Sequence, residues 1–126
     1  MMKNQQKENY KKLLALMPFI LEIDEGHATL TAPGFMDLEV EVLFREGSKI
    51  SIALSHYYTQ NSDLIPDPDM ELVLDTEAET VAAISYQDSF AYQRIEGRPQ
   101  YASSLDRFLG MWLSNLKAQG HTIREE

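Results

Sequence analysis

One central segment of the chain concentrates the side chains that could carry chemistry, and its only imidazole is His56. An imidazole near carboxylates can supply ligands for a divalent metal, or the two groups of general acid–base catalysis. The carboxylates that follow are Asp63, Asp67 and Asp69. Their spacing fits no metal-ligand pattern, and the Asp-Pro-Asp run lacks the glycine and closing glutamate of a calcium loop. We therefore favour a structural His56, hydrogen-bonded at a strand end, over a metal-dependent hydrolase that uses it.

The other polar and aromatic residues of this segment also have two interpretations. Consecutive Tyr57 and Tyr58 point to opposite faces of a strand, so at least one of them reaches the surface or a groove. A core role is the simpler explanation, since the hydroxyl of a buried tyrosine usually finds a polar partner, and ligand contact is the alternative. Gln60, Asn61 and Asp63 are suited to holding a loop through side chain to backbone hydrogen bonds. The candidate binding residues are His56, Tyr57, Tyr58, Gln60, Asn61, Asp63, Asp67 and Asp69.

Familiar catalytic motifs do not occur in the sequence. It contains no Gly-x-Ser-x-Gly, no glycine-rich phosphate loop with its lysine, and no cysteine. These absences count against serine hydrolases, nucleotide hydrolases of the familiar kinds and thiolate chemistry. We assign no catalytic residue, metal ligand or cofactor, and expect a non-enzymatic protein.

Charge is distributed unevenly along the chain. Twenty acidic and eleven basic residues give a net charge of -9, and residues 50–93 contain no lysine or arginine but eight carboxylates. Such a segment repels phosphate groups, so direct nucleic-acid binding and binding to anionic membranes are not expected. Solvated strand faces are the simplest explanation, and a site for a cation or a basic partner is the alternative. A further alternative is an acidic mimic of nucleic acid, which would carry rows of carboxylates and bind in a salt-sensitive way.

The periodicity of apolar residues predicts the elements that position this segment. Helical spacing predicts a helix over 4–17, ended by Pro18, and a second helix with Ser103 as N-cap, Asp106 in its capping box and Gly120 as its C′ residue. Alternation predicts strands at 27–31, 38–44, 50–56, 70–75, 81–87 and 90–95, with Phe44 on the buried face. Residues 60–69 are predicted to form a loop, because two prolines there cannot donate to a ladder.

These elements define the expected architecture. The chain lacks a βαβ alternation, so the fold class is α+β: an antiparallel sheet of about five to six strands with an N-terminal and a C-terminal helix packed on one face. Residues 1–126 fit a single domain. The polar start of the chain and the short apolar run 13–21 predict no signal peptide and no membrane span, so a cytoplasmic protein is the default. The apolar stretch 19–21 is available for a homodimer.

The central segment also resembles a known signature. Residues 56–64 read His-Tyr-Tyr-Thr-Gln-Asn-Ser-Asp-Leu and residues 67–71 read Asp-Pro-Asp-Met-Glu. This resembles a bacterial and phage- or plasmid-borne domain family of unknown function, in which the runs typically read His-Tyr-Tyr-x-Gln-Asn-Gly-Asp-Leu and Asp-Pro-Glu-Met. Segments 33–38, 85–87 and 116–120 resemble the family as well, so the likeness covers roughly residues 33–120.

Two departures from that signature stand out. Ser62 replaces a glycine, which makes a positive φ less comfortable there, and Asp69 replaces a glutamate, which shortens the reach of the carboxylate. The resemblance implies a domain unit without an assigned activity. The leading hypothesis is a non-enzymatic accessory module of bacterial mobile elements that acts through an unidentified protein partner.

Overall fold

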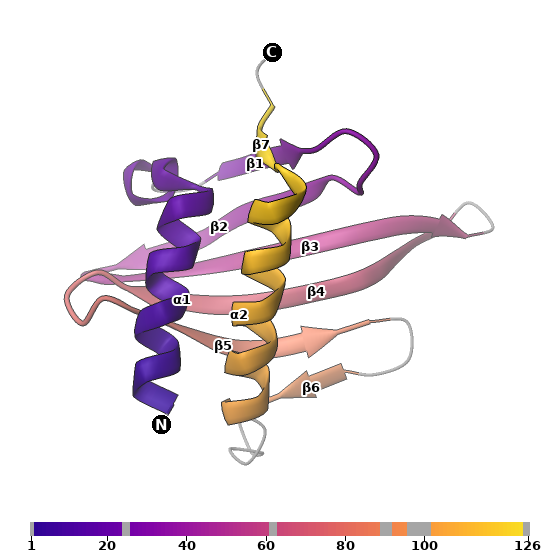
Figure 1. Cartoon of the computed structure of the whole chain (residues 1–126). Coiled ribbons are helices and arrows are strands. Elements are labelled where there is room, and N and C mark those ends of the chain that lie inside the picture. Colours follow the sequence, from indigo (N-terminus) through magenta and orange to yellow (C-terminus); the bar gives the residue numbers. More distant parts are fainter. Residues whose placement is uncertain (1, 24–25, 61–62, 89–91, 96–101, 125–126) are drawn as a thin grey trace.

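Two helices cover one face of a single antiparallel sheet (Figure 1). The computed structural model describes the backbone of residues 2–23, 26–60, 63–88, 92–95 and 102–124, and the side chains of these residues except 2–3, 57–60, 63–67 and 93. The helices are α1 (Met2–Leu16) and α2 (Ala102–Gln119), and a short 3-10 helix, η1 (Pro18–Glu22), follows α1. The predicted α+β fold is confirmed. No helix in the described part of the chain is long and apolar enough to cross a membrane.

The sheet has the order β6-β5-β4-β3-β2-β1-β7. Its strands are β1 (Gly26–Thr31), β2 (Leu38–Glu46), β3 (Lys49–Gln60), β4 (Asp63–Asp75), β5 (Thr80–Gln87), β6 (Tyr92–Arg94) and β7 (Thr122–Ile123). The first six strands follow one another as a meander, and the two-residue β7 then pairs with β1 at the far edge. The prediction of about five to six strands therefore missed only this short last strand.

Strands β3 and β4 form a hairpin that runs through the region predicted as a loop. Tyr57 pairs with Pro66 and Gln60 with Asp63, so the loop prediction for 60–69 was wrong. The register shifts between Ser55 and Tyr57, so that two residues, 67 and 68, lie opposite one on β3. The described pairing of β4 with β5 begins only at residue 69, so the prolines occupy a bulge and a stretch paired on one side. Proline is tolerated at such positions because a missing N–H there breaks no second ladder.

The core lies between the helices and one face of the sheet. Alternate residues of β2, β3 and β4 point toward α1 and α2 and are buried, among them Val40, Ile52 and Leu72. A bulge in β2 interrupts this alternation, because Leu43 is an extra residue between Val42 and Phe44. Phe44 is consequently 53% exposed, and the prediction that it faces the core was wrong.

The apolar run after α1 divides between core and surface. Ile20 of η1 is fully buried, whereas Leu21 is exposed. The guanidinium of Arg45 donates hydrogen bonds to the backbone oxygens of Leu21 and Ile23, at 3.0 and 2.8 Å. These bonds satisfy carbonyl groups at the end of η1 and fix it against β2.

The ends of α2 differ in how well the sequence predicts them. The helix begins at Ala102, so Ser103 lies inside it and accepts a hydrogen bond from Arg107 instead of capping the helix. At the other end Gly120 has φ +91°, and its N–H donates to the Lys117 oxygen. The N–H of His121 donates to the Leu116 oxygen, which completes a Schellman motif and confirms the predicted C′ glycine.

Asp106 is buried in the interface of α1, α2 and β5. Its Oδ1 accepts a hydrogen bond from the Ala83 N–H at 2.8 Å, and its Oδ2 accepts one from the Gln6 amide at 3.0 Å. Its backbone oxygen accepts from the Asn9 amide. Burial raises the pKa of the Asp106 carboxyl, and the hydrogen bonds from Ala83 and Gln6 oppose that shift. The predicted capping-box role of Asp106 was therefore wrong, and this carboxylate joins three elements.

Candidate functional site

His56 lies on the helix-covered face of the sheet. It is 8% exposed, and its Nδ1 is 2.8 Å from the backbone oxygen of Asp37. A carbonyl oxygen only accepts, so this contact is a hydrogen bond when Nδ1 carries the proton. The ring also meets Trp112 edge-on at 5.5 Å and lies 6.0 Å from the His121 ring, measured between centroids. His56 of β3 thus packs against α2 and against His121, which follows that helix.

The sheet separates His56 from the one predicted carboxylate partner whose side chain the structure describes. Asp69 pairs with Ser55, and both residues line a groove on the face turned away from α1 and α2. His56, the next residue of β3, points the opposite way toward Trp112. Asn61 and the side chains of Tyr57, Tyr58, Gln60, Asp63 and Asp67 lie outside the described residues. Among the described residues, no group of three or more histidine, aspartate or glutamate side chains could hold a metal ion.

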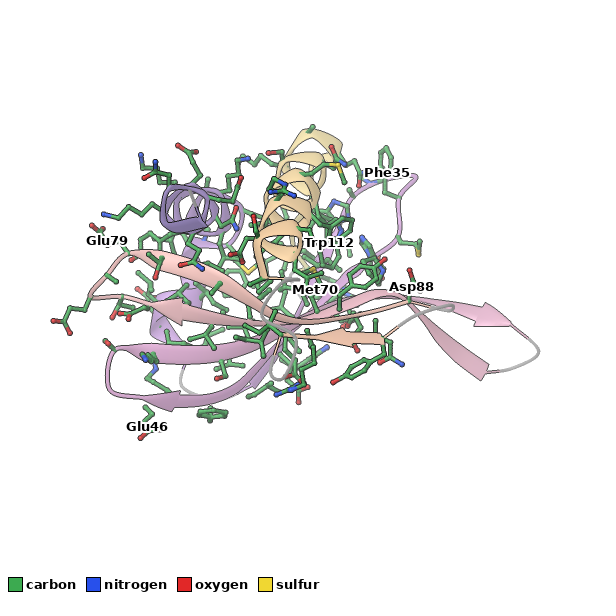
Figure 2. The ribbon with its side chains drawn as sticks, turned by 90° about the horizontal axis from the view of Figure 1, so that it is seen from below. Phe35, Glu46, Met70, Glu79, Asp88 and Trp112 are labelled. Atoms are coloured by element: carbon green, nitrogen blue, oxygen red, sulfur yellow. The ribbon has the colours of Figure 1, made fainter. Side chains whose placement is uncertain are left out.

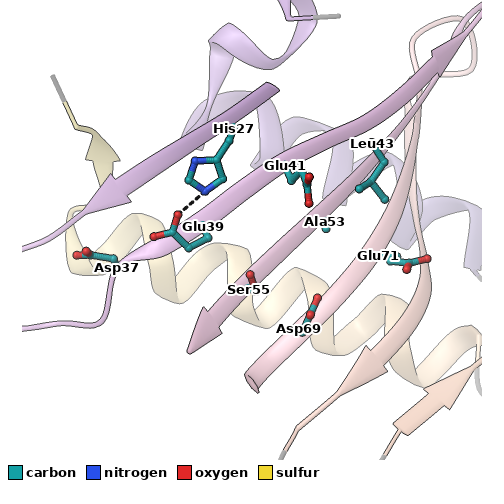
Figure 3. Close-up of a pocket in the computed structure, with 9 residues that line it drawn as sticks. All are labelled: His27, Asp37, Glu39, Glu41, Leu43, Ala53, Ser55, Asp69 and Glu71. Carbon is teal, nitrogen blue, oxygen red and sulfur yellow. Dashed lines mark ion pairs between the residues drawn. The ribbon is translucent and has the colours of Figure 1, made fainter. Parts of the chain in front are cut away.

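The sheet face turned away from α1 and α2, here called the open face, carries a groove of about 660 Å³ (Figure 3). Figure 2 shows both helices on the other side of the sheet. The groove is lined by His27, Asp37, Glu39, Glu41, Leu43, Ala53, Ser55, Asp69 and Glu71. Five of these nine residues carry a carboxylate, and we call the feature the acidic groove.

Strand pairing arranges most of these carboxylates in two rungs across the sheet. Ser55 of β3 pairs with Glu39 of β2 on one side and Asp69 of β4 on the other. Two residues earlier on β3, Ala53 pairs in the same way with Glu41 and Glu71. Each rung therefore places an acidic side chain on both sides of a small one. The small side chains form the floor of the groove, and the acidic ones form its two walls.

Some wall carboxylates already have partners, but the positive charges are few. Glu39 accepts from the Thr29 hydroxyl at 2.9 Å and contacts His27 Nε2 at 2.5 Å. Glu71 forms an ion pair with Arg94 at 3.2 Å. Glu41 has no hydrogen-bond or ion-pair partner within the described part of the chain. The groove therefore keeps an excess of negative charge.

Ser55 lies at the floor of the acidic groove. The residue is 6% exposed and lines the groove, where Figure 3 shows its side-chain oxygen between the two walls. Among the residues that the structure describes, its hydroxyl has no hydrogen-bond partner, and its oxygen is open to solvent in the groove. A hydroxyl at the bottom of a groove, without a protein partner, is available to a ligand.

Sequence reasoning selected only Asp69 among the residues of this groove. The alternation over 38–44 places Glu39 and Glu41 on the face opposite the core, but by itself does not connect them with the acidic residues of β4. The missing information was the register of β2 against β3 and of β3 against β4, which brings residues 39–41 and 69–71 to opposite walls. Acidic alternation in two segments that flank a common strand was the available signal.

Comparisons with known proteins place the chain in a family but assign no activity. No curated protein and no solved structure matches it significantly. Residues 8–122 match the model described as a domain of unknown function, DUF6908. That match includes the acidic groove, all of α2 and most of α1. The chain belongs to the family of the DUF6908 domain of unknown function.

Proposed function

We propose that this domain is a non-enzymatic interaction module whose open face binds a basic segment of a partner protein. The observation that carries the proposal is the acidic groove, in which two rungs of carboxylates line a sheet face that α1 and α2 leave uncovered. Helices on one face bury the core, so residues on the open face are free to be selected for binding. A bacterial accessory role for mobile elements, in the cytoplasm, is the setting that the signature in residues 56–71 suggests.

The surroundings of the groove also suit a protein partner. Leu43 lies in the groove, and Phe44 and Tyr92 are exposed apolar residues of β2 and β6. Protein interfaces combine aromatic contacts with complementary charge, and complementary charge mainly speeds association and selects the partner. A basic segment with apolar residues at its ends would match this surface.

The hydrolase alternative has less support from the geometry. It requires His56 and a carboxylate on one side of the sheet, whereas Asp69 lies on the other side. Asp63 and Asp67 come before Asp69 on β4, in the part of that strand that runs beside the last residues of β3. The module is therefore the better account of the described side chains.

The proposal is tested by affinity capture from lysate of the source cell. Glu39→Gln, Glu41→Gln and Glu71→Gln combined remove three wall charges, and Glu46→Gln with Glu77→Gln removes exposed charges elsewhere. We expect the wild type and the control to retain the same basic partner, the triple variant to lose it, and binding to weaken as salt rises. Retention of that partner by the triple variant would refute the role of the groove.

A second candidate function is mimicry of nucleic acid. Glu39 with Glu41 on β2, and Asp69 with Glu71 on β4, form two rows of carboxylates, as such a mimic requires. In that case the basic partner is a DNA-binding protein, and duplex DNA displaces it from the domain. If the partner binds the domain and DNA together, mimicry is ruled out while the interaction module stands.

A further inference from the structure

The two rungs of the acidic groove enclose a space suited to one organic cation. We infer that the centre of the groove is a receptor for an alkylammonium or guanidinium group, an inference that rests on the proposed function and specifies its ligand. The rungs place Glu39 and Glu41 on one wall, and Asp69 and Glu71 on the other, above Ser55. A cation between these walls donates hydrogen bonds to both sides at once.

The hydroxyl of Ser55 distinguishes the acidic groove from an ordinary acidic surface. Its residue is 6% exposed, faces the groove, and has no hydrogen-bond partner among the described residues. The oxygen is open to solvent in the groove, so a ligand that enters there has to replace the bonds that it makes to water. A bound N–H group that donates to Ser55 Oγ, while the hydroxyl proton turns toward a carboxylate, replaces these bonds to water.

The geometry favours an organic cation over a metal ion. Neighbouring strands are about 4.8 Å apart, so the backbones of the two walls are roughly 10 Å apart across β3. Metal ligands must converge on one point, and no such group of three exists among the described residues. A planar guanidinium or an ammonium with three N–H groups instead reaches several separated acceptors.

Glu41 provides an acceptor that is ready for the ligand. It has no partner within the described part of the chain, whereas His27 and Arg94 already occupy Glu39 and Glu71. Same-face residues on a strand are roughly 6.6 Å apart, so the two rungs together hold one side chain laid along β3. The cation can come from a lysine or arginine of the partner, or from a free polyamine.

The test is a set of NMR titrations of the folded, uniformly ¹⁵N-labelled protein. The probes are acetyl-lysine methylamide, acetyl-arginine methylamide, a short lysine-rich peptide and spermidine. Acetyl-norleucine methylamide and acetyl-citrulline methylamide are the neutral controls of matched shape. We expect the cations to shift the amide signals of residues 39–41, 53–55 and 69–71, and the neutral controls to leave them unchanged.

Variants then assign the contacts. Ser55→Ala and Glu41→Gln should each weaken binding of the cationic probes about threefold to tenfold, as expected for the loss of one net hydrogen bond in a solvent-accessible groove. Ala53→Ile fills the floor without changing a charge and should abolish binding. Glu46→Gln, which makes the same charge change farther along β2, should bind as the wild type does. Because these residues lie on the open face, the NMR spectrum of each variant verifies its fold.

The outcomes separate the receptor from the proposed function. Binding of the peptide and the capped amino acids supports both proposals. Binding of spermidine alone supports the receptor but refutes a protein partner as its source. Equal shifts with neutral controls, an equal loss in Glu46→Gln, or no shift with any cation overturns the receptor. In that last case, loss of the captured partner by the triple variant still upholds the interaction module.

Discussion

Asp106→Ala should destabilise the protein far more than Asp106→Asn. The alanine variant removes the oxygen that accepts the Ala83 N–H at 2.8 Å, and Ala83 is 1% exposed. A buried donor left without a partner costs about 1–3 kcal/mol, and loss of the hydrogen bond from Gln6 adds to this. We expect the free energy of unfolding to fall by about 2–4 kcal/mol, a large share of the roughly 5–15 kcal/mol typical of a domain.

The asparagine variant isolates the effect of charge. The side-chain amide introduced by Asp106→Asn keeps an oxygen for the Ala83 N–H, and the Gln6 amide can turn to accept from the new NH₂ group. We expect the free energy of unfolding to change by less than about 1 kcal/mol near neutral pH, since no buried donor is left unpaired. Urea denaturation followed by the Trp112 fluorescence measures both variants.

The pH dependence of the same pair tests the raised pKa. Burial raises the pKa of the Asp106 carboxyl above its usual value of 3.8, so the folded state binds a proton more tightly than the unfolded state. The contribution of this group is therefore fully favourable below the usual pKa and is lost as pH rises through the raised pKa. The wild type should lose stability relative to Asp106→Asn over that interval. A constant difference across this range, or an Asp106→Ala variant as stable as the wild type, would refute the reasoning.

Three further variants test other contacts by chemical or thermal denaturation. Gly110→Ala should lower the free energy of unfolding by about 1–3 kcal/mol, because its Cβ would lie 2.8 Å from Asn9 Oδ1 where α1 and α2 meet; a gain in stability would contradict this close approach. Glu79→Gly should raise the free energy of unfolding by about 0.5 kcal/mol, because Glu79 has φ +57° and glycine adopts that φ without strain, although glycine also gains entropy in the unfolded state. A fall in the free energy of unfolding would show that Glu79 is not strained. The backbone N–H of Ala78 chiefly lowers the pKa of Asp75, so its stabilising effect is present at neutral pH and is lost as pH falls through the lowered pKa; Asp75→Asn should abolish that part of the pH dependence.

The class and layers of the fold follow from periodicity, whereas its irregular positions do not. Helical spacing around Leu13 and Leu109 and strand alternation around Val40 and Ile52 are strong enough to predict what packs where. The bulge at Leu43 was invisible, because an extra residue in one strand shows only in its pairing with another. The two prolines of β4 led to the wrong loop prediction for a related reason. A strand tolerates proline where one of its sides has no hydrogen-bonded neighbour, and the sequence does not show which side is paired.

The candidate site shows the same division. His56 and Asp69 are close in sequence and both are polar, yet they lie on opposite faces of the sheet. Asp69 pairs with Ser55, whose side chain points away from that of its neighbour His56, and the bulge lies beside His56. The acidic groove combines residues from four strands, and only the register brings Glu41 beside the floor formed by Ala53 and Ser55. The sequence near Asp106 could not reveal its structural role either. Its burial and its hydrogen bonds depend on β5 and α1, which are distant in sequence.

The pairing of the first and last helices has a consequence for synthesis of the chain. Asn9 of α1 bonds to the backbone of Asp106, 97 residues later, while the first six strands can pair with their neighbours as they are made. The apolar side of the meander therefore stays without its α2 cover until residue 119 has left the ribosome. Closing so long a loop is slow, and exposed apolar strands are prone to aggregate. The nascent chain is thus most prone to aggregate while residues 102–119 are still being made.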